Sequence, residues 1–158
     1  LNMSSPAFER SRVELGRASH PVAAAVHDAV RDAATRGTLA VGLGGIAVIH
    51  AVDSVGKWSE TRYMFWMYMA LIVAAIVLAA ATLFHPSRHT FLAAAGLAAT
   101  VMVGFIINRT VGLPQATDDI GNWTEPLGLA SLVVEGLVVA VGLGGYLLGG
   151  REVRASAV

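Results

Sequence analysis

The sequence contains no cysteine among its 158 residues. Disulfides, thiolate metal sites and thiol nucleophiles are therefore excluded as a basis for its fold or chemistry. Charge is also scarce, because Asp, Glu, Lys and Arg make up 14% of the chain, against about 25% in an average soluble domain. Positive and negative charges balance to zero, so the electrostatic signature of a nucleic-acid-binding protein is missing.

What the chain does contain is apolar: 55% of its residues are hydrophobic, and its mean hydropathy is +0.63. These residues gather into four runs, each close to the ~20 residues that a helix needs to cross a membrane. The sequence predicts an all-α, integral membrane, antiparallel four-helix bundle over residues 37–150. The expected spans are about 37–56, 63–84, 89–109 and 127–150.

The polar segment 1–36 is expected to form a helical extension before the first span. One helix is predicted from Pro6 to Leu15, with a stop at Gly16. A second is predicted over residues 21–35, which packs on a protein neighbour or runs straight into the first span. Residues 151–158 form a short tail.

Lys and Arg are distributed unevenly around the spans, and this distribution predicts the orientation. Three of them, Lys57, Arg62 and Arg109, fall on one side of the predicted bundle. Eight fall on the other side: Arg10, Arg12, Arg17, Arg31, Arg36, Arg88, Arg151 and Arg154. Because the side richer in these residues stays in the cytoplasm, both termini are expected to be cytoplasmic in a multi-pass protein of the cell membrane.

The fourth span contains a single acidic residue, Glu135. A charge inside a span costs from ~2.5 kcal/mol upward, so this residue must face other helices, carry a proton or have a partner. His50 in the first span lies at a similar depth, and Asp53 and Lys57 share its helical face. The sequence therefore predicts a polar pocket on the outer side, centred on His50 and Glu135. For His50 alone, a bond to a backbone carbonyl is the structural alternative.

Other residues near the same end are expected to extend this pocket. Glu60 is a further candidate ligand, and Met64 and Met67 lie one turn apart at the start of the second span. Arg109 is expected to reach Glu135, Asp118 or Asp119 with its guanidinium group, or to extend to lipid phosphates. Asp118, Asp119 and Trp123 belong to a long loop that is either a lid or an ordered connector, with the two acids capping a short helix over residues 120–123.

Four functions fit this cluster. His50, Asp53, Glu60 and Glu135 are ligand types for zinc or copper, and the two methionines extend the set toward copper(I). Glu135 and His50 would also suit proton carriage. A small-ligand or quinone pocket would use Trp66, Tyr68 and Trp123 as walls. Finally, the cluster would lock together an accessory subunit of a respiratory or transport complex. We favour binding of a metal ion or small ligand, with the accessory subunit as the alternative.

Two kinds of chemistry are disfavoured. A haem held by two histidines of this chain does not fit, because His50 lies near one face of the membrane and His85 and His89 lie near the other. No Ser, Thr or acid stands with a histidine at the spacing of a known hydrolase motif, so an enzyme is not the favoured reading.

Small residues recur at helix-packing spacing in three spans. They are Ala70 and Ala74, then Gly96, Thr100 and Gly104, then Gly145 and Gly149. Packing within the bundle is favoured, and pairing with a second copy or another protein is the alternative.

The last third of the chain carries a recognisable run, with Gly112-Leu113-Pro114, Asp119 to Trp123, Glu125 to Gly128, and Glu135. This run resembles small four-span bacterial membrane proteins that have no assigned biochemical role. The resemblance implies a four-span protein of the bacterial inner membrane and places Glu135 in a shared motif. It supplies no catalytic residue.

Overall fold

The computed structural model of the protein describes residues 6–155, and the side chains of residues 21–148. Its elements are α1 (Pro6–Glu60), α2 (Arg62–Phe84), α3 (Arg88–Thr110), the short 3-10 helix η1 (Thr117–Asp119) and α4 (Pro126–Ala155). Residues 6–155 contain no β-strand, so the all-α prediction is confirmed.

The first helix differs from the prediction, because α1 is one helix of 55 residues. The expected stop at Gly16 does not interrupt it, and residues 21–35 run straight into the first span, as one of the two predicted alternatives had it. A lone glycine costs a helix only about 1 kcal/mol relative to alanine, which flanking helix-forming residues offset. The chain nevertheless divides into two compact units, Leu1–Ala34 and Thr35–Val158. The bundle and the cavity described below belong to the second unit.

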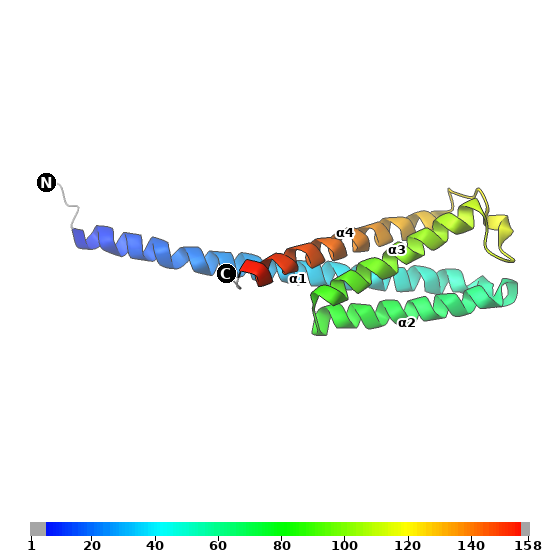
Figure 1. Ribbon diagram of the computed structural model, residues 1–158, viewed down its shortest axis with the longest axis horizontal. Coiled ribbons are helices and arrows are strands. Elements are labelled where there is room, and N and C mark those ends of the chain that lie inside the picture. Colours follow the sequence, from blue (N-terminus) through cyan, green and yellow to red (C-terminus); the bar gives the residue numbers. More distant parts are fainter. Residues whose placement is uncertain (1–5, 156–158) are drawn as a thin grey trace. The chain divides into compact units, whose positions relative to one another are not determined.

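Four helical stretches are long and apolar enough to cross a membrane: Pro21–Glu60, Arg62–Phe84, Arg88–Thr110 and Pro126–Leu148. Each overlaps one of the four predicted spans, and together they indicate a multi-pass membrane protein. Within the second unit the helices run alternately up and down (Figure 1). The α1–α2 turn and the α3–α4 loop meet at one end, here called the loop end, and the α2–α3 turn lies at the other.

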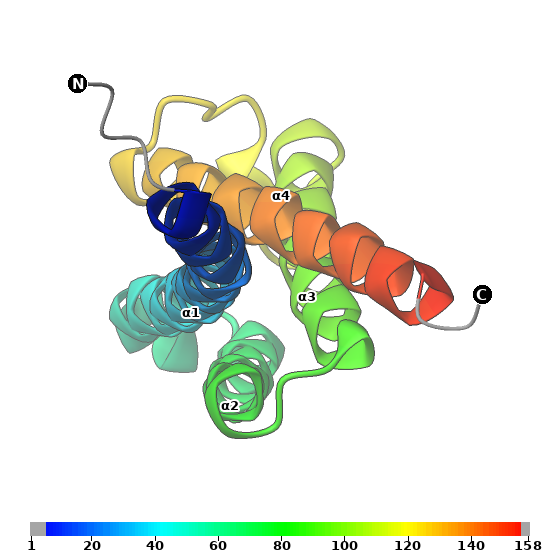
Figure 2. The same cartoon turned by 90° about the vertical axis from the view of Figure 1, so that its left-hand side faces the viewer.

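The interior of the second unit is divided along its length. Toward the α2–α3 turn it is a packed apolar core, which draws on all four helices (Figure 2). This core consists of Leu39, Leu43, Ile46, Ala47, Ala75, Phe91, Ala94, Ala98 and Val138. Toward the loop end the interior side chains become polar and the packing is incomplete. The loop end is therefore the part of the bundle that has room for a ligand.

Glycines of α4 let it approach α3 closely in the packed core. A Cβ atom placed on Gly142 would lie 2.8 Å from the Phe91 carbonyl oxygen, and one on Gly145 would lie 2.8 Å from the Phe91 ring. Gly145 thus packs within the bundle as predicted, and Gly149 lies outside the residues whose surroundings are described. Gly96 and Gly104 of α3 do not make the close contacts predicted for them, since a Cβ on either would meet nothing within 4 Å.

Replacing Gly142 by Ala is expected to destabilise the bundle by roughly 1–3 kcal/mol, because the backbone of α3 cannot make room for the new methyl group. Gly136→Ala on the same helix is the matched control, since its Cβ would enter open space. The free energy of unfolding in mixed micelles, followed by circular dichroism during an SDS titration, measures both. Equal stability of the two variants would contradict the close α3–α4 contact.

Candidate functional site

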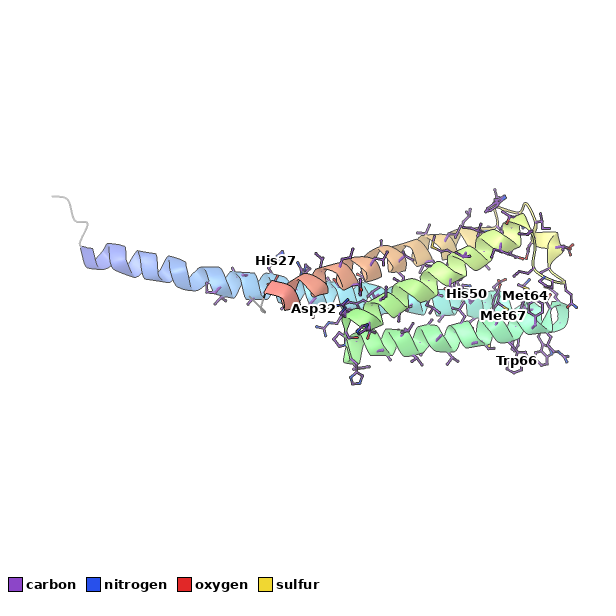
Figure 3. The ribbon with its side chains drawn as sticks, in the orientation of Figure 1. His27, Asp32, His50, Met64, Trp66 and Met67 are labelled. Carbon is purple, nitrogen blue, oxygen red and sulfur yellow. The ribbon has the colours of Figure 1, made fainter. Side chains whose placement is uncertain are left out.

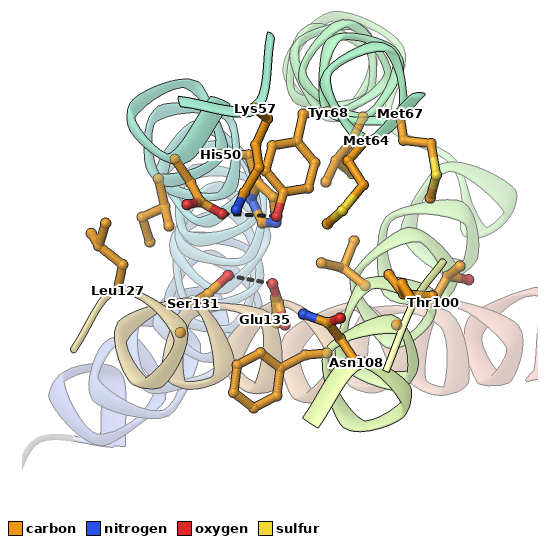
Figure 4. Close-up of a pocket in the computed structure, with 18 of the residues that line it drawn as sticks. His50, Lys57, Met64, Met67, Tyr68, Thr100, Asn108, Leu127, Ser131 and Glu135 are labelled. Atoms are coloured by element: carbon orange, nitrogen blue, oxygen red, sulfur yellow. Dashed lines mark hydrogen bonds between the residues drawn. The ribbon is translucent and has the colours of Figure 1, made fainter. Parts of the chain in front are cut away.

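A cavity of about 610 Å³ lies between the four helices at the loop end (Figure 4). Its volume falls within the ~300–1,000 Å³ that is usual for small-molecule sites. One part of its wall is apolar and includes Met64, Leu71 and Val101, while another part is polar. The polar part includes both residues on which the predicted pocket was centred, His50 and Glu135.

Glu135 is buried, with 1% of its surface exposed. Its Oε1 atom accepts a short hydrogen bond from the hydroxyl of Ser131, one turn earlier on α4 (Figure 4). Its Oε2 atom has no hydrogen-bond partner in the described part of the chain. The carboxyl group is therefore half satisfied by its own helix, and its second oxygen lacks the partner that a buried polar atom normally has.

His50 is also buried, at 8% exposure. Its Nδ1 atom lies 2.9 Å from the backbone oxygen of Ile46. Because a carbonyl oxygen only accepts, Nδ1 carries a proton and donates this bond. The ring packs edge-on against Tyr68, with centroids 5.2 Å apart. His50 and Glu135 line one cavity, but neither of these described side chains hydrogen-bonds to the other.

The helical face that carries His50 also brings Asp53 and Lys57 to the cavity. The Tyr68 hydroxyl donates a hydrogen bond of 2.8 Å to Asp53 Oδ2 and so joins α2 to α1. The predicted shared face of His50, Asp53 and Lys57 is thus present. Tyr68 of α2 is bonded to this face through Asp53.

Arg109 anchors the polar wall at the end of α3. The side chain is 6% exposed, and its guanidinium group contacts two carboxylates: Nη1 lies 2.6 Å from Asp119 Oδ1, and Nη2 lies 3.1 Å from Glu125 Oε2. Of the three partners predicted for Arg109, only Asp119 is bonded. Glu125 was not predicted as a site residue, and it also accepts hydrogen bonds from the amides of Leu127 and Gly128 at the start of α4.

Asn108 completes this network. Its Nδ2 atom donates to Asp119 Oδ2 at 2.9 Å, but its Oδ1 atom is buried without a partner, as is Nε of Arg109. With Glu135 Oε2, three buried polar atoms of the described side chains lack partners, and all three belong to residues that line the cavity. Each such atom costs about 1–3 kcal/mol unless something bonds to it.

The pKa of Asp119 is set by these contacts. Partial burial opposes ionisation, but the hydrogen bonds from Asn108 and Arg109 and the Arg109 charge outweigh it and hold the pKa below its ordinary value of 3.8. Asp119 is therefore a carboxylate at neutral pH and a stable partner for Arg109.

The loop between α3 and α4 forms a roof over the cavity, to which Leu113 and Asp119 contribute. The Tyr63 hydroxyl donates to the Pro114 carbonyl at 2.6 Å, and the Thr61 hydroxyl donates to that of Gln115 at 3.4 Å. The Gly121 amide donates to the Arg109 carbonyl at 2.9 Å. The predicted helix over 120–123 is absent, and the acids lie in η1 instead.

Several predicted site residues lie outside the cavity. Glu60 is exposed and pairs with Lys57 at 3.2 Å, and Asp118 is exposed in η1. Trp66 points away from the bundle in Figure 3 and packs on Trp58 and Phe65, while Trp123 packs on Phe105. The tryptophan walls of the quinone hypothesis are therefore wrong, although Tyr68, Met64 and Met67 do line the cavity.

The residues predicted to bind a metal ion are His50, Asp53, Glu60 and Glu135. Among the described residues, no group of three or more His, Asp and Glu side chains stands close enough to hold a metal ion. With Glu60 outside, the predicted four-residue ligand set is not assembled. The arrangement is better suited to hydrogen bonding than to coordination.

Comparison of the chain with protein-family models, with curated proteins and with solved structures gives no match.

Replacing Asp119 by Asn is expected to lower the free energy of unfolding at pH 7 by roughly 1.5–3 kcal/mol, the usual worth of hydrogen bonds to charged groups. Because folding lowers the Asp119 pKa, its contribution is complete above the unfolded-state value and is lost as the pH falls through the folded-state value. The difference between the wild type and Asp119→Asn should therefore shrink from about pH 5 downward.

SDS titrations of both proteins at several pH values measure this difference, with Asp118→Asn as the control. A gap between the wild type and Asp119→Asn that stayed constant with pH would refute the assigned ion pair.

Proposed function

We propose that this protein binds a small organic ligand in the cavity beside His50 and Glu135. The observation that carries the proposal is the set of three buried, unpartnered polar atoms: Asn108 Oδ1, Arg109 Nε and Glu135 Oε2. All three belong to residues lining one cavity of about 610 Å³. Buried polar atoms are nearly always bonded, so a bound molecule accounts for their arrangement.

The ligand's chemistry follows from these atoms. Asn108 Oδ1 only accepts and Arg109 Nε only donates, while Glu135 Oε2 accepts when ionised and donates when protonated. The Arg109 charge is already balanced by Asp119 and Glu125. A neutral polar group that both donates and accepts therefore fits this wall better than an anion does.

An organic ligand is preferred to a metal ion for two reasons. The described residues include no group of three His, Asp or Glu side chains placed to hold a metal ion. Most of the remaining cavity wall is formed by apolar side chains such as Leu71, Leu97 and Val101, which suit a carbon skeleton.

The proposed orientation follows from the uneven distribution of Lys and Arg, which favours cytoplasmic termini. The loop end and its cavity would then face the outside of the cell. In this orientation the cavity binds its ligand at the outer side of the membrane.

An accessory subunit is the second candidate. It is favoured by the surface around Gly96 and Thr100, where exposed small residues leave room for a neighbouring helix. In that case the polar wall at the loop end would only stabilise the chain.

Native mass spectrometry of the protein, purified in mild detergent, separates the two. Binding predicts an organic adduct on the wild type that is about tenfold less populated in Glu135→Leu, a factor that corresponds to ~1.4 kcal/mol. Asp118→Asn, changed outside the cavity, should keep it.

The same variants test whether Glu135 is structural. Because its Oε2 atom is unpartnered, replacing the carboxyl group by an apolar side chain should leave thermal stability equal or higher. A strongly destabilised Glu135→Leu with no adduct on the wild type, and protein partners in fixed ratio, would support the subunit instead. Metal bound in fixed ratio by the wild type and lost in His50→Ala would also overturn the proposal.

A further inference from the structure

We infer that the ligand is a neutral amphiphile dissolved in the bilayer, such as a long-chain alcohol or phenol, and that it reaches the cavity between α2 and α3. This inference rests on the proposed ligand site and adds the ligand's class and route. The route is here called the α2–α3 seam, and it is lined by Met67, Ala70, Ala74, Thr100 and Gly104.

The cavity is covered toward the water at the loop end. Leu113 and Asp119 lie over it, and the loop that carries them is bonded to Thr61, Tyr63 and the Arg109 carbonyl. The ion pairs of Arg109 with Asp119 and Glu125 add to this cover. In the opposite direction the packed apolar core fills the interior.

The wall between α2 and α3 carries most of the exposed cavity lining. Four cavity-lining residues, all in the described part of the chain, are exposed: Met67, Ala70, Thr100 and Leu127. Three of these belong to the α2–α3 seam, while Leu127 lies in the first turn of α4. The cavity thus extends to the side of the bundle.

Side-chain size explains why this seam is open. Ala70, Ala74 and Gly104 contribute little volume, and a Cβ on Gly104 would meet nothing within 4 Å. The seams made by α4 differ. A Cβ on Gly128 would lie 2.5 Å from the Phe105 ring of α3, and one on Gly45 would lie 3.2 Å from Val134. Small residues are used for close contact at α4 and leave a gap at α2–α3.

The seam lies at a depth where lipid chains surround the protein. Gly104 and Thr100 precede the end of α3 at Thr110 by six and ten residues, which correspond to ~9 and ~15 Å along the helix. The hydrocarbon layer is ~30 Å thick, so the opening faces acyl chains. A molecule that passes there must be soluble in hydrocarbon.

The two ends of such a molecule match the two parts of the cavity. A hydroxyl group donates to Asn108 Oδ1 and accepts from Arg109 Nε, and its second lone pair accepts from Glu135 Oε2 when that carboxyl carries a proton. An apolar chain lies along Met67, Leu71 and Val101 and leaves through the seam. The hydroxyl of Thr100 adds no polar barrier, since it donates to the Gly96 carbonyl at 2.8 Å.

The test is photolabelling in preformed proteoliposomes. The probe is a long-chain alcohol with a diazirine next to its hydroxyl end, and labelled peptides are identified by mass spectrometry after irradiation at increasing times. In the wild type, label is expected on the peptides that contain Asn108 and Glu135. Glu135→Leu should lose this label, because it removes a polar group of the site.

Variants of the seam test the route. Ala70→Phe and Gly104→Phe should slow labelling about tenfold, the effect of ~1.4 kcal/mol on a barrier. Met67→Ala should speed it, because it widens the seam. Val73→Phe and Val103→Phe are the matched controls on the same two helices, since both positions are exposed and line no part of the cavity. Circular dichroism checks that each variant is folded.

The route, the ligand class and a covering second copy each give a different result. Wild-type labelling that Glu135→Leu abolishes but no α2–α3 variant alters would refute the route and leave the ligand site standing. Labelling by a short, water-soluble diazirine alcohol but not by the long-chain probe would refute the amphiphile. A stable dimer seen in native mass spectra, lost in Gly104→Phe, would show that a second copy covers the seam and would overturn the inference.

Discussion

The loop end is arranged around a carboxyl group, that of Glu135, held inside an apolar bundle with one oxygen bonded to Ser131 and the other without a partner in the described part of the chain. An acid at this place prevents the loop end from packing as the other end does, because apolar side chains pressed against it would increase the cost of its burial. The bundle separates tight packing and the buried acid along its length. Glycines and apolar side chains hold one half together, and the other half keeps space around its polar groups.

Arg109 stabilises the polar half of the bundle through two ion pairs. Its two carboxylate partners come from η1 and from the residue before α4, so one guanidinium group fixes the end of α3, the loop and the start of α4. Glu125 serves twice, as an ion-pair partner and as an acceptor for the first free amides of α4. The network therefore joins α3, the loop and α4 and closes the roof with the same atoms.

Much of this was predictable from the sequence, and the exceptions have physical causes. Hydrophobic length located the four spans, and helical periodicity brought His50, Asp53 and Lys57 to one wall. The continuous α1 was missed because a single glycine is a weak stop within a helix. Glu60 and Asp118 were misplaced, and the partner Glu125 was overlooked, because turn and loop geometry decides which acids face inward. Pro126 marks the first position of a helix, so the carboxylate of the preceding Glu125 could have been expected near the free amides of that helix start. The unpartnered atoms depend on three-dimensional packing, which no spacing rule provides.

The bonds from Tyr63 and Thr61 to the loop have a mechanical consequence. They attach the start of α2 to the cover over the cavity, so that helix and cover are parts of one linkage. If α2 tilts away from its neighbour, the cover is pulled with it, unless both bonds break first. Movement of the start of α2 and movement of the loop are thus coupled through these two bonds, and a change on either side of that linkage affects the other.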